Sequence, residues 1–128
     1  MWKVIWDESL EANIRTIDDL DRLLDRLQHE RKDSPVLATV ESPSTGDSLT
    51  IGLGRSESVL NFASSSGAPP YWTSVGDNLE DGGVDFNFMG EISEFSLRHL
   101  IPLNLARQAL RDFAQSGTRS KAVKWEEV

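Results

Sequence analysis

The spacing of apolar residues changes twice along this chain of 128 residues, and that change restricts the fold more than any other feature. Between residues 17 and 31, leucines recur every three or four positions, which is typical of an amphipathic helix. From residue 36 to residue 88, short runs alternate apolar with polar side chains between turn residues, which is typical of strands. Helical spacing returns over residues 102–116. The pattern predicts two helices packed on one sheet.

Both predicted helices have recognisable ends. Thr16 occupies the position of an N-cap, and Asp19 follows three residues later in a pattern that resembles a capping box. Ser34-Pro35 ends this first helix, because the residue before a proline is disfavoured in helical conformation. Pro102 suits the first turn of the second helix, and Gly117 can close that helix in a left-handed conformation.

Short runs with strand-like patterns are predicted as strands at residues 2–6, 36–41, 49–53, 59–63, 71–75, 84–88 and 123–125. The stretch after the first run, through Ala12 and Asn13, is predicted as a loop. Short connections favour an antiparallel meander, because parallel strands need long crossovers. We therefore expect one domain over residues 1–128. Its fold should be α+β, with a mostly antiparallel sheet of five to seven strands and both helices on one face.

Residue types that support catalysis or metal binding are scarce. The chain has no Cys, which excludes a thiol nucleophile, a disulfide scaffold and every Cys-ligated metal site. His29 and His99 are the two histidines, and no Gly-x-Ser-x-Gly turn accompanies them. The evenly spaced Asp77, Asp81 and Asp85 lack the alternating ligands of a calcium loop. We predict no enzyme activity, no metal and no cofactor; an enzyme that uses scattered carboxylates is an alternative without a motif.

Neither a phosphate loop nor a membrane segment is indicated. Gly52-Leu53-Gly54 ends a strand with no helix pattern after it and no Lys nearby, so we expect a turn or bulge. No run approaches 18 apolar residues, and Asp7 and Glu8 come before any signal-peptide core could form. The absence of Cys fits a reducing compartment, and we expect a cytoplasmic protein.

Charge is unevenly distributed along the chain, whose net charge is −8. Residues 35–95 carry nine acids and a single base, Arg55, whereas residues 96–128 carry six bases and three acids. A protein that binds nucleic acid directly needs a basic surface, so we expect no direct contact with nucleic acid. A concentrated acidic surface attracts cationic partners and speeds their association. Drift in surface composition is the alternative reading.

The acids that we expect to face a partner lie in loops, which display their side chains. They are Asp77, Glu80 and Asp81, with Glu57 and Asp47 as weaker candidates. Asp85 is a strand residue whose neighbours Val84 and Phe86 should point to the opposite face, so it too can face outward.

Tyr71 and Trp72 are the aromatic pair of interest, because neighbours on a strand point to opposite faces. Most of the four Trp residues are expected in the core. If one member of the pair is in the core, the other faces the far side of the sheet among acids, where it would anchor a partner. We expect that anchor to be Trp72, or Tyr71 if the register is the other way.

A series of short motifs runs through the second and third thirds of the chain. The motifs are Pro70-Tyr71-Trp72-Thr73-Ser74-Val75-Gly76-Asp77, Gly90, Glu94-Phe95, Leu100-Ile101-Pro102, Ala106, Ala109, Phe113, Gly117 and Val123-Lys124-Trp125-Glu126-Glu127-Val128. In this order they resemble the first-numbered immunity-protein family of bacterial polymorphic toxin systems. The resemblance covers residues 36–128 and is most specific at 70–77 and 94–102; residues 1–35 match only in type. It implies a small cytoplasmic α+β protein that is encoded beside a toxin. The toxin is often a nucleic-acid deaminase, and the immunity protein binds the toxin and has no catalytic activity of its own. The resemblance does not identify the residues that contact the toxin, because these vary within the family.

The residues and the resemblance point to one mechanism. A deaminase must hold nucleic acid near its catalytic site, so its groove is usually basic. An acidic protein of this size could fill such a groove and replace phosphates with carboxylates. The alternative is an acidic adaptor or regulatory module that binds another basic protein. The neighbouring open reading frame, or a pulldown from a native lysate, would separate the two.

Overall fold

The computed structural model describes residues 1–128, and strands make up most of its regular structure. In chain order the elements are β1 (Trp2–Trp6), β2 (Leu10–Ile14), α1 (Ile17–Glu30), β3 (Val36–Glu41), β4 (Ser48–Leu53), β5 (Glu57–Ser58), β6 (Leu60–Ala63), β7 (Trp72–Val75), β8 (Gly83–Phe88), β9 (Glu91–Ser96), the 3-10 turn η1 (Leu97–His99), β10 (Ile101–Pro102), α2 (Leu103–Ser116) and β11 (Lys124–Glu127). The expected α+β class is confirmed.

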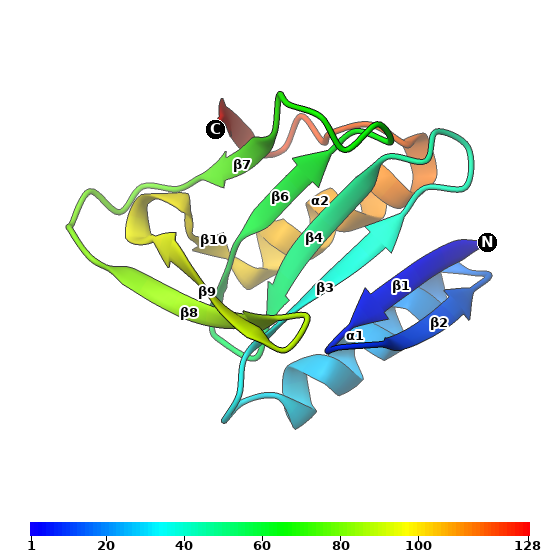
Figure 1. Ribbon diagram of the computed structural model, residues 1–128, viewed down its shortest axis with the longest axis horizontal. Helices are drawn as coiled ribbons and strands as arrows, with labels where there is room; N and C mark the ends of the chain where they lie inside the picture. The colour runs from blue at the N-terminus through cyan, green and yellow to red at the C-terminus, as the bar shows by residue number, and fades with distance from the viewer.

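The main sheet is mostly antiparallel, as the short connections predicted. Its strands follow the order β11-β7-β6-β4-β3-β1-β2, in which β3, β4, β6 and β7 form a meander (Figure 1). The hairpin β8–β9 branches from this order through one parallel bridge between Val36 of β3 and Asn87 of β8. A separate two-stranded sheet pairs β5 with β10. The hairpin therefore leaves the plane of the meander while staying attached to its centre.

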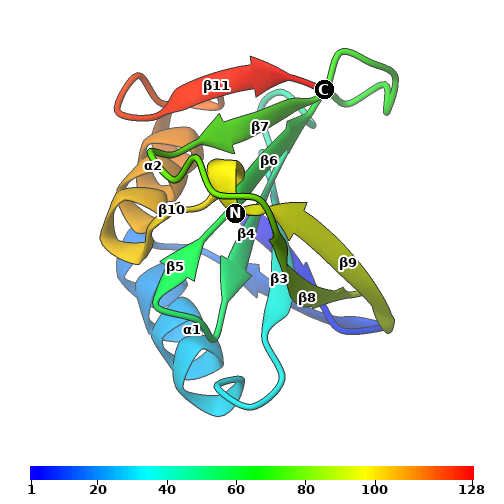
Figure 2. The same ribbon diagram turned by 90° about the vertical axis from the view of Figure 1, so that its left-hand side faces the viewer.

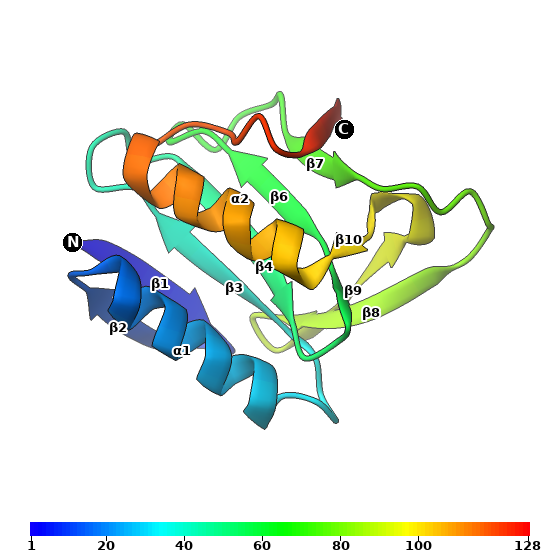
Figure 3. The same cartoon turned by 180° about the vertical axis from the view of Figure 1, so that it is seen from behind.

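Both helices cover one face of the sheet, and the β8–β9 hairpin lies on the other side (Figure 2). Viewed from behind, α1 and α2 lie in front of the strands (Figure 3). Strand alternation explains the arrangement: Val36, Ala38 and Val40 of β3 belong to the core cluster of 20 buried residues that the helices share, while Leu37 belongs to a second cluster on the hairpin side. The prediction that both helices share one face is confirmed.

The hairpin packs on the sheet through a smaller cluster. Its buried members are Leu37, Val59, Phe86 and Leu100. Gly52 of β4 makes room for the Phe86 ring, because a Cβ at Gly52 would lie 2.7 Å from that ring. Gly52 thus allows a close approach between the sheet and the hairpin.

The helix ends agree closely with the sequence. The backbone N–H of Asp19 donates to Thr16 Oγ1 over 3.1 Å, so Thr16 is an N-cap. The Asp19 carboxylate accepts from Arg22 instead of turning back to Thr16, so only half of a capping box forms. At the end of α2, Gly117 adopts a φ of 77° and its N–H donates to the Phe113 carbonyl.

Strand number is where the sequence prediction was wrong. The main sheet has nine strands rather than five to seven. Residues 10–14, expected as a loop, pair with β1 as β2, and residues 91–96 pair with β8 as β9. The expected strand at 59–63 begins one residue later, as β6, and the additional short strand β5 precedes it. In β9, Ile92 and Phe95 fall on opposite faces, so the strand lacks the alternation that would have indicated it.

Candidate partner-binding surface

One continuous stretch of the chain holds acids without any base. Residues 76–96, here called the acidic segment, run from the β7–β8 loop through the β8–β9 hairpin and contain six Asp or Glu and no Lys, Arg or His. None of these six acids forms an ion pair, although the chain has ten ion pairs in total. Their negative charge is therefore uncompensated at close range and projects into solvent.

The β7–β8 loop displays its acids from a fixed base. Gly76 begins the loop, and its N–H donates to the Arg98 carbonyl over 2.7 Å. A Cβ at this position would lie 1.8 Å from the Leu100 carbonyl oxygen, so only glycine allows the contact with η1. Further along, Asn78 Oδ1 accepts from the backbone N–H of Glu80 over 2.9 Å. The predicted candidates Asp77, Glu80 and Asp81 are all exposed on this loop.

A cleft beside the loop brings two predicted acids together. Asp77, from the β7–β8 loop, and Glu57, from β5, both line a cleft of about 360 Å³. The cleft is also lined by the apolar Leu100 and Leu105 and by the amine-bearing Lys124. Its two carboxylates come from segments far apart in the sequence, and its size and open shape suit a side chain of a partner protein.

A smaller hollow of about 180 Å³ holds two more of the predicted acids. Glu80 and Asp81 line it together with Arg98. The Arg98 guanidinium also bonds the Glu126 carboxylate, and His99 Nε2 lies 2.8 Å from the second Glu126 oxygen. The hydrogen bond from Arg98, followed by that of His99, lowers the pKa of Glu126. Because Glu126 pairs with Arg98, this cation offsets little of the charge of the acidic segment.

Asp85 lies on the outward face of the hairpin, as predicted. Its side chain is exposed, while Phe86 is buried and Val84 is partly buried on the opposite face. Glu94 of β9 lies directly across from Asp85 in the register. Like charges in this position repel each other. Arg55 does not pair with either carboxylate: its guanidinium donates to the Asp85 carbonyl oxygen over 2.8 Å and covers the Phe86 ring.

Asp47 is the one predicted acid that lies apart from the others. It sits in the turn between β3 and β4, where its carboxylate accepts from the Ser65 N–H over 2.9 Å. The hollow beside it is lined by Arg119 and Lys121. Asp47 therefore belongs to the basic end of the molecule and does not extend the acidic segment.

Tyr71 and Trp72 both have partners inside the protein. The Tyr71 hydroxyl donates to the Gly67 carbonyl over 2.5 Å. Trp72 pairs in register with Phe62, and the Arg119 guanidinium covers its ring at 3.9 Å from the centroid. Both rings are partly buried, so neither is the exposed aromatic among acids that the sequence suggested. A role for either ring in binding stays a prediction.

Comparison with known protein families gives a match over most of the chain. The family model described as immunity protein Imm1 matches residues 9–127. The chain belongs to the Imm1 family. A search of curated proteins finds no match. Membership of Imm1 makes the chain an immunity protein of a toxin system, and the match includes β2 and α1, which the sequence motifs had not covered.

Other features of this Imm1 chain bear on its chemistry. His29 is exposed on α1, and the His99 ring bonds the Glu126 carboxylate, which is the one side-chain hydrogen bond that either imidazole makes. No group of three Asp, Glu or His side chains is placed to hold a metal ion. Neither helix is long and apolar enough to cross a membrane.

Sequence reasoning missed the apolar end of the β8–β9 hairpin of this Imm1 protein. Phe88, Met89 and Ile92 are exposed there, within five positions of one another. The signal was present in the tight pair Met89-Gly90, where two positive φ values make a two-residue turn. It was hard to recognise because that turn usually takes Asn or Asp followed by Gly.

Proposed function

We propose that this chain neutralises a toxin that acts on nucleic acid, of the deaminase type, by placing the acidic segment in the basic groove of that toxin. It would act in the cytoplasm, where the toxin meets its substrate, and by stoichiometric binding rather than by catalysis. The observation that carries the proposal is the set of six exposed or outward-facing acids, all without ion pairs, in a chain of the Imm1 family.

The charge of the acidic segment suits the groove of such a toxin. A toxin that processes nucleic acid needs Lys and Arg side chains that hold phosphates. Asp77, Glu80 and Asp81 on the β7–β8 loop would take the place of those phosphates, with Asp85 and Glu57 at the sides. Long-range attraction between surfaces of opposite charge raises the association rate and makes it sensitive to salt.

The fixed base of the loop supports the same proposal. Gly76 holds the start of the β7–β8 loop against η1, and the Asn78 side chain holds its middle. A loop that already has its bound shape loses less conformational entropy when a partner binds. The acids are thus offered in a defined arrangement rather than on a free tail.

The direct test measures binding kinetics with the toxin domain encoded beside this chain, made catalytically inactive. The variant replaces Asp77, Glu80 and Asp81 with Lys. We expect association to slow by at least about tenfold at low salt, with a smaller salt dependence, because steering is lost. Each exposed substitution should change stability by less than about 0.5 kcal/mol.

The matched control replaces three other exposed acids, Asp18, Asp33 and Glu127, with Lys. It changes the net charge by the same amount but leaves the acidic segment intact, so its association should slow much less. Equal slowing by both variants would show that only total charge matters and would contradict the proposed site.

Neutralisation is tested separately by co-expressing the active toxin with this chain and assaying base deamination in nucleic acid. We expect full suppression at equal stoichiometry. A toxin of another chemistry that is still neutralised would overturn the deaminase assignment alone. Absence of any complex with the neighbouring toxin, together with capture of a different basic protein, would replace the proposal with the adaptor function.

A further inference from the structure

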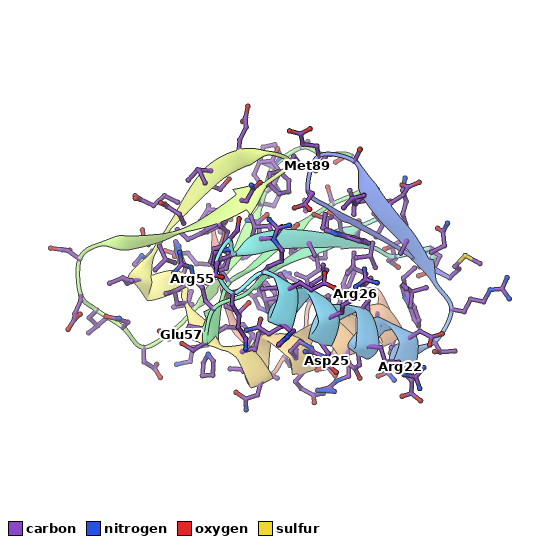
Figure 4. All side chains as sticks on the ribbon, turned by 90° about the horizontal axis from the view of Figure 1, so that it is seen from below. Arg22, Asp25, Arg26, Arg55, Glu57 and Met89 are labelled. Atoms are coloured by element: carbon purple, nitrogen blue, oxygen red, sulfur yellow. The ribbon has the colours of Figure 1, made fainter.

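The tip of the β8–β9 hairpin is an apolar protrusion at the edge of the molecule. It consists of Phe88, Met89 and Ile92, and Figure 4 shows that Met89 lies far from the labelled residues of α1. Ile92 is 69% exposed and Met89 is 44% exposed. Soluble proteins seldom gather exposed large apolar side chains on one small element unless it contacts another molecule.

The turn itself carries a second, independent observation. Met89 has a φ of 54° and Gly90 a φ of 86°, so both central residues of the turn are left-handed. A bulky residue is rare in this conformation, which favours Asn, Asp or Gly. The chain thus holds an apolar side chain at the tip against the local preference, as is typical of residues that are kept for contact rather than for folding.

No further strand pairs with this protrusion. Strand β9 pairs only with β8, and its outward face carries Ile92 and Glu94. Ile92 and Asn87 lie opposite each other on that outward face, whereas Phe88 and Glu91 lie opposite each other on the inward one. The tip is therefore apolar on both faces of the hairpin, a shape that fits into a pocket rather than against a flat surface.

Acids surround the apolar tip. Glu91 lies within the tip, Glu94 follows it on β9, Asp85 precedes it on β8, and the Glu8 side chain lies against Gly90. No Lys, Arg or His lies within the hairpin. A second copy of this chain would bring the same acids together, so like-charge repulsion disfavours self-association through the tip. The charge complements a partner whose apolar pocket is rimmed by Lys or Arg.

We infer that the Phe88–Met89–Ile92 tip is the anchoring contact of the complex, inserted into an apolar pocket beside the basic groove of the toxin. This inference rests on the proposed function. It assigns the association rate and the dissociation rate to different residues. The β7–β8 loop sets the association rate by charge, whereas the hairpin tip sets the dissociation rate by burial. Apolar anchors at the centre of an interface act mainly on dissociation.

The test compares a tip variant and a control variant for binding to the inactive toxin domain from the neighbouring reading frame. Met89→Ala with Ile92→Ala removes most of the tip without changing any charge. We expect its dissociation to be about thirtyfold faster and its association rate to stay within about twofold. The matched control is Val128→Ala, which truncates a large side chain that is 55% exposed after β11, at the far edge of the main sheet. The control should dissociate like the wild type.

The possible outcomes separate this inference from the proposed function. If the wild type binds and the Lys variant of the loop associates slowly, but the tip variant dissociates at the wild-type rate, the anchor is refuted and the function stands. If the wild type does not bind the toxin, both fall. A wild-type dimer that the tip substitutions dissociate, seen by light scattering, would also overturn the assignment. Circular dichroism checks that each variant is folded.

Discussion

In the helix layer, formed by α1 and α2, every Arg side chain pairs with an acid, whereas in the acidic segment no acid has a cationic partner. Arg107 bonds both Asp21 and Asp25 across the two helices, and Arg111 approaches Asp21 at 3.6 Å. The acidic segment has six acids and no base. The same net negative chain therefore neutralises its charges in one region and displays them in the other.

Apolar side chains are also buried in the helix layer and exposed at the hairpin. The helix layer and the sheet share 20 buried core residues, while the hairpin is attached by four and leaves three large apolar side chains exposed at its tip. Burial in the first region contributes most of the folding free energy. Most of the buried core thus lies on the helix side of the sheet, whereas the proposed anchor lies on the hairpin. Under the proposed mode of binding, we expect substitutions in the core and in the hairpin tip to affect stability and binding separately.

The largest expected effect of breaking this division is on the helix side. Phe113 is fully buried in α2 and packs edge-on against Phe62 at 6.1 Å between ring centroids. Phe113→Ala should lower the free energy of unfolding by about 3–5 kcal/mol, because it leaves a cavity in the core. Chemical denaturation measures this loss. At a temperature where the variant stays folded, its toxin-binding rates should equal those of the wild type; altered rates would contradict the division.

The sequence predicted the elements that depend on local patterns and missed those that depend on pairing between distant residues. Both helices were predicted to within one residue at each end, because their periodicity and caps are local. Strand β9 was missed because its apolar residues Ile92 and Phe95 face opposite ways. Residues 91–96 form a strand because they pair with β8, and no pattern within these residues indicates that pairing.

The candidate surface was predictable to the same degree. Exposure of the loop acids followed from their position between strands, and the outward direction of Asp85 followed from alternation with Phe86. The cover that Arg119 places over Trp72 was not predictable, because the two residues meet only through the pairing of β11 with β7. Contacts between distant segments decide which aromatic is free, and a single sequence does not state them.

A smaller effect is expected from the charges of the helix layer. Arg107 is largely buried between the helices, and Arg107→Ala would leave Asp21 and Asp25 without their shared partner. We expect the free energy of unfolding to fall by about 1–3 kcal/mol. Arg22→Ala is the control: Arg22 pairs with Asp19 at 2.9 Å but is mostly exposed, so its loss should cost less than about 1 kcal/mol. Equal losses in urea denaturation would show that Arg107 is merely a surface charge.

The smallest effect distinguishes the two regions by its sign. Glu94→Gln removes one of two carboxylates that lie directly opposite each other on the hairpin, the other being Asp85. Relief of this repulsion should raise the free energy of unfolding by about 0.2–1 kcal/mol, while loss of the ion-paired Asp21 from the helix layer should lower it. The same change removes one charge from the proposed binding surface, so association with the toxin should become slower and less sensitive to salt.

Glu127→Gln on β11 is the control, since Glu127 is exposed and lies opposite Trp72 rather than another acid. A Glu94 variant that loses stability would mean that this carboxylate helps to hold the hairpin in place. A gain in stability together with slower association would show that the chain keeps repelling charges at a cost to its fold because a partner needs them.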